Sequence, residues 1–278
     1  MSTASTTTRA IRTMNDAASR NKWAQSTAGR WTIRIVTLVV LLGAWEIAAQ
    51  DVSRALIAPP SEIFAAAWQQ LFVTGTVWGP FFDSMFVLVT GLAAAIAIGL
   101  PIGIAMGRWK KVAFALDPYV TFLYCLPHVA LVPLMIILLG FGYEFRLGYV
   151  ILSAVWPVII NTMAGVRAVD KDLIDAGVAY TANERQIIWG IILPAASPFM
   201  VAGGRQAFSA AWSGVIVSEI TSTLVGIGGQ IKLFAIDYLT ADMFVPIFFI
   251  MIVAVSIQAF AAWAQRKLTP WQVERVSR

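Results

Sequence analysis

Six long apolar segments are the feature that most limits how this chain can fold. Each holds about 20 mostly apolar residues, the length that an α-helix needs to cross the hydrocarbon core of a bilayer. The segments are residues 31–49, 81–106, 120–139, 149–166, 199–217 and 244–263. Only 13% of the 278 residues are charged, against roughly a quarter in a typical soluble domain. The sequence therefore predicts an all-α polytopic membrane protein with six transmembrane helices.

The basic residues predict which way these helices run. With the N-terminus inside, 16 of the 20 Lys and Arg residues fall on the cytoplasmic side. Arg54, Arg146 and Lys232 fall outside, and Arg205 lies in the fifth segment. Cytoplasmic loops are enriched in Lys and Arg, so both termini are predicted to be cytoplasmic. The net charge of +5 follows membrane side instead of clustering on one face, which argues against nucleic-acid binding.

The chain divides by composition into a membrane domain with a tail at each end. Residues 1–28 are rich in Ser, Thr and Arg and predict a disordered, basic cytoplasmic tail. A secretory signal peptide is disfavoured because the first apolar run begins only near Ile33; a mitochondrial transit peptide remains a minor alternative. Residues 29–268 are predicted to form the transmembrane domain, and residues 269–278 a C-terminal cytoplasmic tail.

A polar loop at residues 169–194 separates the fourth and fifth apolar segments on the predicted cytoplasmic side. Acidic residues open it, which suits the positive end of a short helix, and we predict that helix over residues 171–181. Small residues at Ala176 and Gly177 would let a partner approach the backbone. Pro194 and Pro198 predict a break in the helix where the chain re-enters the membrane. The alternative is an ordinary amphipathic helix on the membrane surface.

The loop carries a motif whose parts recur in order along the chain. Asp175-Ala176-Gly177 is followed by Thr181 and then by Leu193-Pro194. Residues 56–61, 131–134 and 161–167 supply further matches. From about residue 56 to 270, the chain resembles the permease subunit of bacterial ABC importers of the nitrate, sulfonate and taurine group, the binding-protein-dependent transport inner-membrane components. That family has Glu-Ala-Ala at the first three loop positions and Gly where Thr181 stands.

This resemblance implies a type I importer permease fold and an ATP-driven importer for a small, anionic solute such as a sulfonate, taurine, nitrate or bicarbonate. The implied partners are a dimer of ABC ATPase subunits, an extracytoplasmic substrate-binding protein and a second copy of the chain. ATP would be bound by the ATPase, so the chain itself is expected to be no enzyme and to hold no cofactor or metal. The implied location is the plasma (inner) membrane of a prokaryote. The residues implied in ATPase coupling are Asp175, Ala176, Gly177, Tyr180, Thr181, Leu193 and Pro194.

Four further residues are candidates to line the substrate pathway. They are His128, Trp212, Ser213 and Glu219. His128 is the single histidine and cannot form a metal site by itself. Glu219 lies near the outer end of the fifth segment, where an acidic group is costly and often functional; its alternative is a solvated residue at the interface.

The Gly-rich run at residues 224–230 resembles an ATPase signature loop, but the chain lacks a phosphate-binding Gly-x-x-x-x-Gly-Lys-Ser/Thr motif. We therefore predict a flexible turn after the fifth segment. A stand-alone secondary transporter or channel is the main alternative function, disfavoured because no inverted repeat is visible. An intramembrane enzyme is disfavoured because the chain has no Gly-x-Ser-x-Gly motif and no His-rich metal set.

Overall fold

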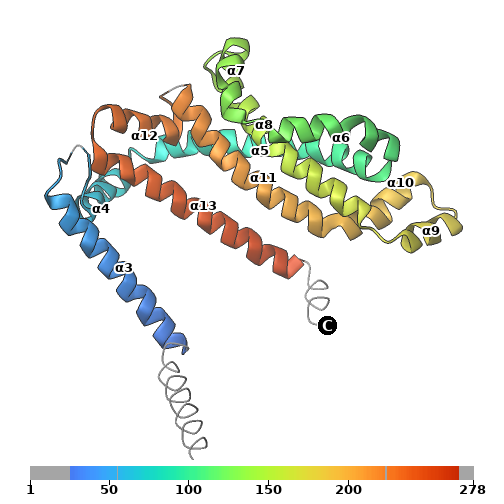
Figure 1. Ribbon diagram of the computed structural model, residues 1–278, viewed down its shortest axis with the longest axis horizontal. Helices are drawn as coiled ribbons and strands as arrows, with labels where there is room; N and C mark the ends of the chain where they lie inside the picture. Colours follow the sequence, from blue (N-terminus) through green and yellow to red (C-terminus); the bar gives the residue numbers. More distant parts are fainter. Residues whose placement is uncertain (1–25, 55, 223, 269–278) are drawn as a thin grey trace, which may run out of the picture. The chain divides into compact units, whose positions relative to one another are not determined.

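The structure is a computed structural model that describes residues 26–54, 56–222 and 224–268 (Figure 1). Within those ranges the chain is helical, with no strand. Residues 1–25 of the predicted N-terminal tail and the whole predicted C-terminal tail, 269–278, lie outside the described residues. The chain divides into two compact units, Met1–Ala65 and Ala66–Arg278.

The first unit contains α3 (Thr27–Gln50) and the start of α4 (Pro60–Trp68). The Ser26 hydroxyl caps α3 by accepting the Gly29 N–H at 3.0 Å, as N-cap serines do. The Glu46 carboxylate accepts the Ser61 N–H at 3.0 Å and its hydroxyl at 2.7 Å. These two bonds hold the start of α4 against α3.

The second unit holds the remaining elements. They are η1 (Gln69–Val73), α5 (Trp78–Arg108), α6 (Lys110–Cys125), η2 (His128–Leu131), α7 (Val132–Leu139), α8 (Tyr143–Arg167), α9 (Lys171–Ala179), α10 (Glu184–Ile187), η3 (Ile188–Ile192), α11 (Leu193–Thr221), α12 (Gly226–Ile236) and α13 (Thr240–Leu268). Five helical segments of the described chain are long and apolar enough to cross a membrane: α3, α5, α8, α13 and the stretch that ends with α11. They correspond to five of the six predicted segments.

The third predicted segment, residues 120–139, is not one straight helix. The chain bends by 88° between α6 and the helical stretch His128–Leu139, so the described residues hold a sixth span only if this bent pair crosses the membrane as one. Leu126 is extended, with ψ 132°, because a residue that precedes proline is disfavoured in the α region. Pro127 offers no N–H to continue the α6 hydrogen-bond ladder. Apolar content alone does not reveal this break.

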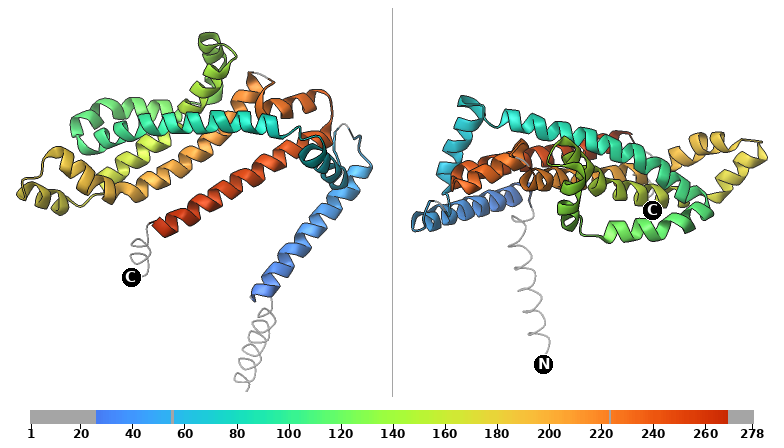
Figure 2. Two further views of the ribbon diagram at one scale, coloured as in Figure 1. Left: turned by 180° about the vertical axis from the view of Figure 1, so that it is seen from behind. Right: turned by 90° about the horizontal axis from the view of Figure 1, so that it is seen from above.

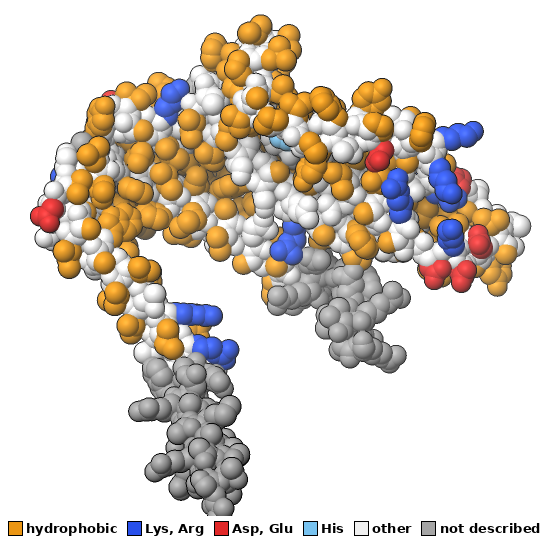
Figure 3. All heavy atoms as spheres, viewed as in Figure 1, with side chains coloured by type: hydrophobic (Ala, Val, Ile, Leu, Met, Phe, Trp, Pro, Cys, Tyr) orange, Lys and Arg blue, Asp and Glu red, His pale blue; other side chains and the backbone are white. Residues whose placement is uncertain are grey.

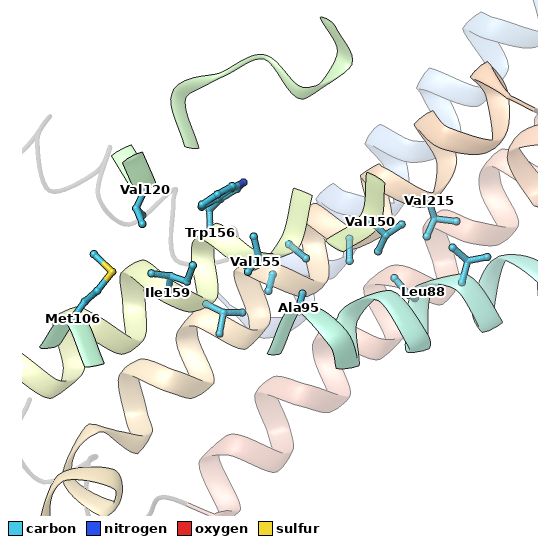
Figure 4. Packing of buried hydrophobic residues seen from close by; sticks show 14 of the residues in the cluster. Leu88, Ala95, Met106, Val120, Val150, Val155, Trp156, Ile159 and Val215 are labelled. Carbon is cyan, nitrogen blue, oxygen red and sulfur yellow. The ribbon is translucent and has the colours of Figure 1, made fainter. Parts of the chain in front are cut away.

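The core of the second unit is a layer in which α8 lies between α5 and α11 (Figures 1 and 2). Two thirds of the most apolar stretch of α8 is buried. Figure 4 shows the buried side chains that meet there, such as Leu88 of α5, Val150 of α8 and Val215 of α11. The helices that adjoin the polar loop therefore belong to the most tightly packed part of the molecule.

Small residues let α5 and α8 approach closely. Gly91, Ala95, Gly99, Gly103 and Gly107 recur every four residues, which places them on one face of α5. A Cβ on Gly99 would lie 2.8 Å from the Cβ of Val158, and one on Gly103 would lie 2.8 Å from the carbonyl oxygen of Ile159. Larger side chains would force the backbones apart, as expected for small-residue contacts between membrane helices.

Candidate functional site

The predicted loop helix is α9, Lys171–Ala179. The Asp170 side chain caps it by accepting the Asp172 N–H at 3.0 Å. Asp172 in the first turn also faces the positive end of the helix dipole. The helix begins where the sequence predicts and ends two residues earlier than residue 181.

Thr181 is the residue that reverses the chain at the end of α9. Its φ is +62°, a left-handed conformation that glycine adopts most easily. The Ala182 N–H donates to the Gly177 carbonyl at 3.0 Å, and the Thr181 N–H donates to the Val178 carbonyl at 2.9 Å. This pair of bonds is a Schellman motif. The turn that Gly would favour is therefore kept, with a β-branched residue in its most strained position.

The inner face of α9 rests on the chain that leads to α11. Ile174 packs against a small buried cluster that includes Val166 of α8, Ile187 of α10 and Ile192 of η3. Gly177 lies so close to η3 that an added Cβ would lie 2.8 Å from Cδ1 of Ile191. The loop is thus tied by packing to both neighbouring transmembrane helices.

The outer face of α9 is open. Asp175 and Ala176 are exposed, Tyr180 is 87% exposed, and the apolar side chains of Leu173 and Val178 are more than half exposed. Apolar groups on a polar loop are a common mark of a surface that binds another protein. The structure thus brings Asp175, Ala176 and Tyr180 to one short exposed element, whereas Gly177 faces inward.

The return to the membrane differs from the predicted break. Asn183 and Gln186 form a capping box that starts α10. The chain then stays helical through η3, a π-helical turn, and into α11, where Pro194 occupies the first turn. Proline lacks an N–H for the helical hydrogen-bond ladder, and here it directly follows the π-helical turn, in which the Leu193 N–H donates to the Ile188 carbonyl. Leu193 is half-buried and Pro194 exposed.

An ion pair joins this return segment to α5. Nε of Arg108 lies 2.7 Å from Oε1 of Glu184, and Nη2 lies 3.0 Å from Oε2. Such a two-pronged contact fixes geometry as well as charge. No local sequence pattern marks either residue, because the two are 76 positions apart in the chain.

The candidate pathway residue Glu219 is fully buried, so the alternative of a solvated residue at the interface is wrong. Its carboxylate accepts the Ser84 hydroxyl at 2.8 Å and the Gly228 N–H at 2.9 Å. The Ser84 Oγ in turn accepts the Ile227 N–H at 2.9 Å. Nη1 of Arg146, on α8, lies 3.8 Å from Oε1 of Glu219. Glu219 therefore joins α5, α8, α11 and α12.

The Gly-rich run is the start of α12 and not a flexible turn. Gly226 has φ +78°, and an added Cβ would overlap the Glu219 carboxylate. A Cβ on Gly228 would lie 2.7 Å from the Cβ of Glu219 and 2.8 Å from the carbonyl oxygen of Ile216. These glycines make room for the buried carboxylate at the N-terminus of α12, where the helix dipole favours an anion.

Trp212 and Ser213 line a cavity of about 530 Å³ between α11 and α13, together with Arg205. His128 lies on η2, at the bend between α6 and α7, and is not among the residues that line this cavity. The structure thus brings two of the four pathway candidates together. Among the described residues, no group of three or more His, Cys, Asp and Glu side chains is arranged to hold a metal ion.

The chain is similar in sequence to a family of transport proteins and to several of its members. The sequence pattern of the family described as "binding-protein-dependent transport system inner membrane component" matches residues 95–272. The taurine transport system permease protein of Escherichia coli is 31% identical over 92% of this chain and 95% of its own length. A putative aliphatic sulfonates transport permease protein of Bacillus subtilis is 29% identical over 87% of this chain and 88% of its own. The bicarbonate transport system permease protein of Synechococcus elongatus is 29% identical over 66% of each chain.

A solved structure is similar in fold. It comes from the inward-facing conformations of the MetNI methionine ABC transporter, with a TM-score of 0.61 at 17% identity. The match covers 68% of this chain and 94% of the other. The fold resemblance, the family pattern over residues 95–272 and the relatives all agree with the family expected from the loop motif. The chain belongs to the binding-protein-dependent transport system inner membrane components, the permeases of ABC importers.

Proposed function

We propose that the chain forms the membrane pathway of an ATP-driven importer for a small anionic solute. Relatives of the chain are named for the transport of taurine, aliphatic sulfonates and bicarbonate. These solutes are all small and carry an acidic group, which supports a small anionic solute for this chain. Arg205, in the cavity with Trp212 and Ser213, would attract such an anion. In this proposal Trp212, Ser213 and His128 contact the passing solute, and Glu219 holds the helices around it.

The proposed coupling element is α9, which would sit in a groove on a cytoplasmic ATPase. The observation that carries this assignment is its two-sided character. The outer face is exposed, at Asp175, Ala176 and Tyr180, while the inner face is packed against the chain that leads to α11. A displacement of α9 would therefore be transmitted directly to α8 and α11. A partner shifts the equilibrium between two conformations of a protein only if it binds one of them more tightly. The ATPase must therefore bind α9 with different affinity in its open and closed states.

The partners follow from this proposal. The chain would act as a pair of identical copies, because six spans are half of the twelve-span pathway usual in this family. Two ATPase subunits would bind ATP on the cytoplasmic side, and a substrate-binding protein would deliver solute on the outer side. Both termini of the chain would be cytoplasmic, in the plasma (inner) membrane of a prokaryote. The chain itself would supply no catalytic residue, cofactor or metal.

The test is reconstitution of the chain with its ATPase and binding protein in proteoliposomes. We expect Ala176→Trp to keep ATP hydrolysis while lowering uptake per ATP by at least tenfold, because a bulky group would unseat α9 from the ATPase. The matched control is Ala44→Trp on the exposed surface of α3, which should leave the ratio within twofold. Solute uptake at the wild-type rate in the absence of the ATPase or of ATP would contradict the proposal and favour a secondary transporter or channel.

A further inference from the structure

A second cavity, of about 960 Å³, opens beside the coupling element and plays no part in the proposed transport step. It lies among the end of α5, the first half of α6, the end of α8 and the start of α9. Two of the candidate membrane spans end there, α5 at Arg108 and α8 at Arg167. Because Lys and Arg are enriched at the cytoplasmic ends of membrane spans, we place the cavity at the level of the lipid headgroups.

The lining of this cavity is strongly cationic. Arg108, Lys110, Arg167 and Lys171 line it, against one acidic lining residue among those described, Asp117. Arg108 is already paired with Glu184. Lys110, Arg167 and Lys171 form no ion pair with any residue that the structure describes. Figure 3 shows Lys and Arg side chains at this end of the second unit, with Asp and Glu side chains close by.

Apolar groups form the rim of the same cavity. Phe114 is 88% exposed and Tyr119 is 66% exposed, and both project from α6. Cations alone would suit any soluble anion. Cations beside exposed aromatic rings suit an anion that carries an apolar chain.

We propose that this cavity binds the phosphate-bearing headgroup of an anionic phospholipid. Lys110, Arg167 and Lys171 would contact the phosphate, and the acyl chains would lie along Phe114 and Tyr119. Basic pockets between transmembrane helices on the cytoplasmic side are suited to such headgroups. Lys171 and Ile174 belong to α9 and line the cavity. A bound lipid would therefore also contact α9 and stabilise its position. The inference does not depend on which solute is transported.

The test is native mass spectrometry of the purified full-length chain titrated with phosphatidylglycerol or with phosphatidylcholine. We expect phosphatidylglycerol to bind at least tenfold more tightly. Lys110→Gln and Arg167→Gln should each weaken its binding by about fivefold, the effect of one cation near an anionic surface. The matched control is Lys111→Gln, which removes the same charge one residue away, on an exposed side chain that does not line the cavity. It should change the affinity by less than twofold.

Three outcomes would overturn the proposal. Equal weakening by Lys110→Gln and Lys111→Gln would indicate diffuse attraction to the surface. Equal binding of the two lipids would show that the headgroup charge is not recognised. Displacement of phosphatidylglycerol by soluble glycerol phosphate at equal concentration would identify a free anion in place of a lipid.

A second measurement uses the unaltered chain and so does not depend on the folding of variants. Phosphatidylglycerol carrying a photoreactive group in its acyl chain should crosslink to the α6 peptide that contains Phe114 and Tyr119. Labelling spread evenly over the lipid-facing helices, with no enrichment in α6, would count against the site.

Discussion

Thr181 shows how one residue can keep a family's backbone turn while changing its cost. A β-branched side chain in the left-handed region is strained, by roughly 1–2 kcal/mol for an ordinary L-residue. The Schellman bonds at 2.9 and 3.0 Å hold it there, and its hydroxyl donates to the Tyr180 carbonyl at 2.7 Å. The sequence marked Thr181 as a departure, but only the φ of +62° shows that the turn survives it.

We predict that Thr181→Gly raises the free energy of unfolding by about 1 kcal/mol, because it removes the left-handed strain. Thermal unfolding of the purified chain in detergent measures this. Thr74→Gly is the matched control, since the Thr74 hydroxyl also donates to a backbone carbonyl but its φ is −92°. The control should lose stability. A loss for Thr181→Gly as well would contradict the assignment of strain.

The hydroxyl of Ser84 has a larger predicted effect. Ser84→Ala removes a donor to Glu219 and the acceptor of the Ile227 N–H. Leaving buried polar groups unpaired costs about 1–3 kcal/mol, so the unfolding temperature should fall. Ser256→Ala, at an exposed hydroxyl that bonds only within its own helix, should change stability by less than about 0.5 kcal/mol. Equal effects of the two substitutions would argue against the buried network.

At the scale of helices, the closest contacts run along α8. Gly91, Gly99, Gly103 and Gly107 meet it from α5, and Gly203 and Gly214 meet it from α11. A Cβ on Gly203 would lie 2.8 Å from the Cβ of Asn161. Membrane helices gain stability from such close packing, because lipid offers no hydrophobic drive for helices to associate.

We predict that Gly103→Ala lowers stability by about 1–3 kcal/mol, the usual cost of overpacking, because its Cβ would meet the Ile159 carbonyl oxygen, which cannot rotate away. Gly204→Ala is the control, since a Cβ there meets nothing within 4 Å. It should raise stability by about 0.5–1 kcal/mol, the usual gain of Ala over Gly within a helix. Unfolding of the two variants in the same detergent compares the two signs, and two losses of equal size would contradict this packing.

The sequence predicted the long membrane helices better than the bends and connections between them. Apolar length was enough to place α3, α5, α8, α11 and α13. It failed at the bend before η2, because a broken span contains the same apolar residues as a straight one. It failed again at Pro194, where a π-helical turn kept the chain helical, and at α12, whose glycines reflect a tertiary contact with Glu219. The first two failures come from how proline acts in its local backbone, which apolar length does not report, and the third comes from a contact with Glu219, on a different helix.

At the scale of the whole molecule, the distribution of Lys and Arg gives a direct test of sidedness. The chain has a single cysteine, Cys125, which is exposed and would be replaced by Ser. Tyr180→Cys then reports on the predicted cytoplasmic side and Asp237→Cys on the predicted outer side, and both positions are exposed.

We predict that a membrane-impermeant maleimide labels Asp237→Cys in intact cells and labels Tyr180→Cys only after the cells are permeabilised. The expectation follows from the excess of basic residues on the cytoplasmic side. The Cys125→Ser background without an added cysteine gives the blank. Labelling of Tyr180→Cys in intact cells would reverse the assigned orientation, and the coupling role of α9 would fall with it.

The position of α8 between two glycine-lined neighbours has a consequence for how such a protein can diversify. Where backbones touch, there is no spare volume for a new side chain, so the three-helix layer is closed to substitutions that reshape a binding surface. New solute preferences would have to arise away from these helix contacts, in α6, α7 or α12, or on the faces of α11 and α13 that line the cavity near Trp212. We therefore expect exchange of those outer segments between relatives to transfer solute preference, and exchange of α5 or α8 to cost stability instead.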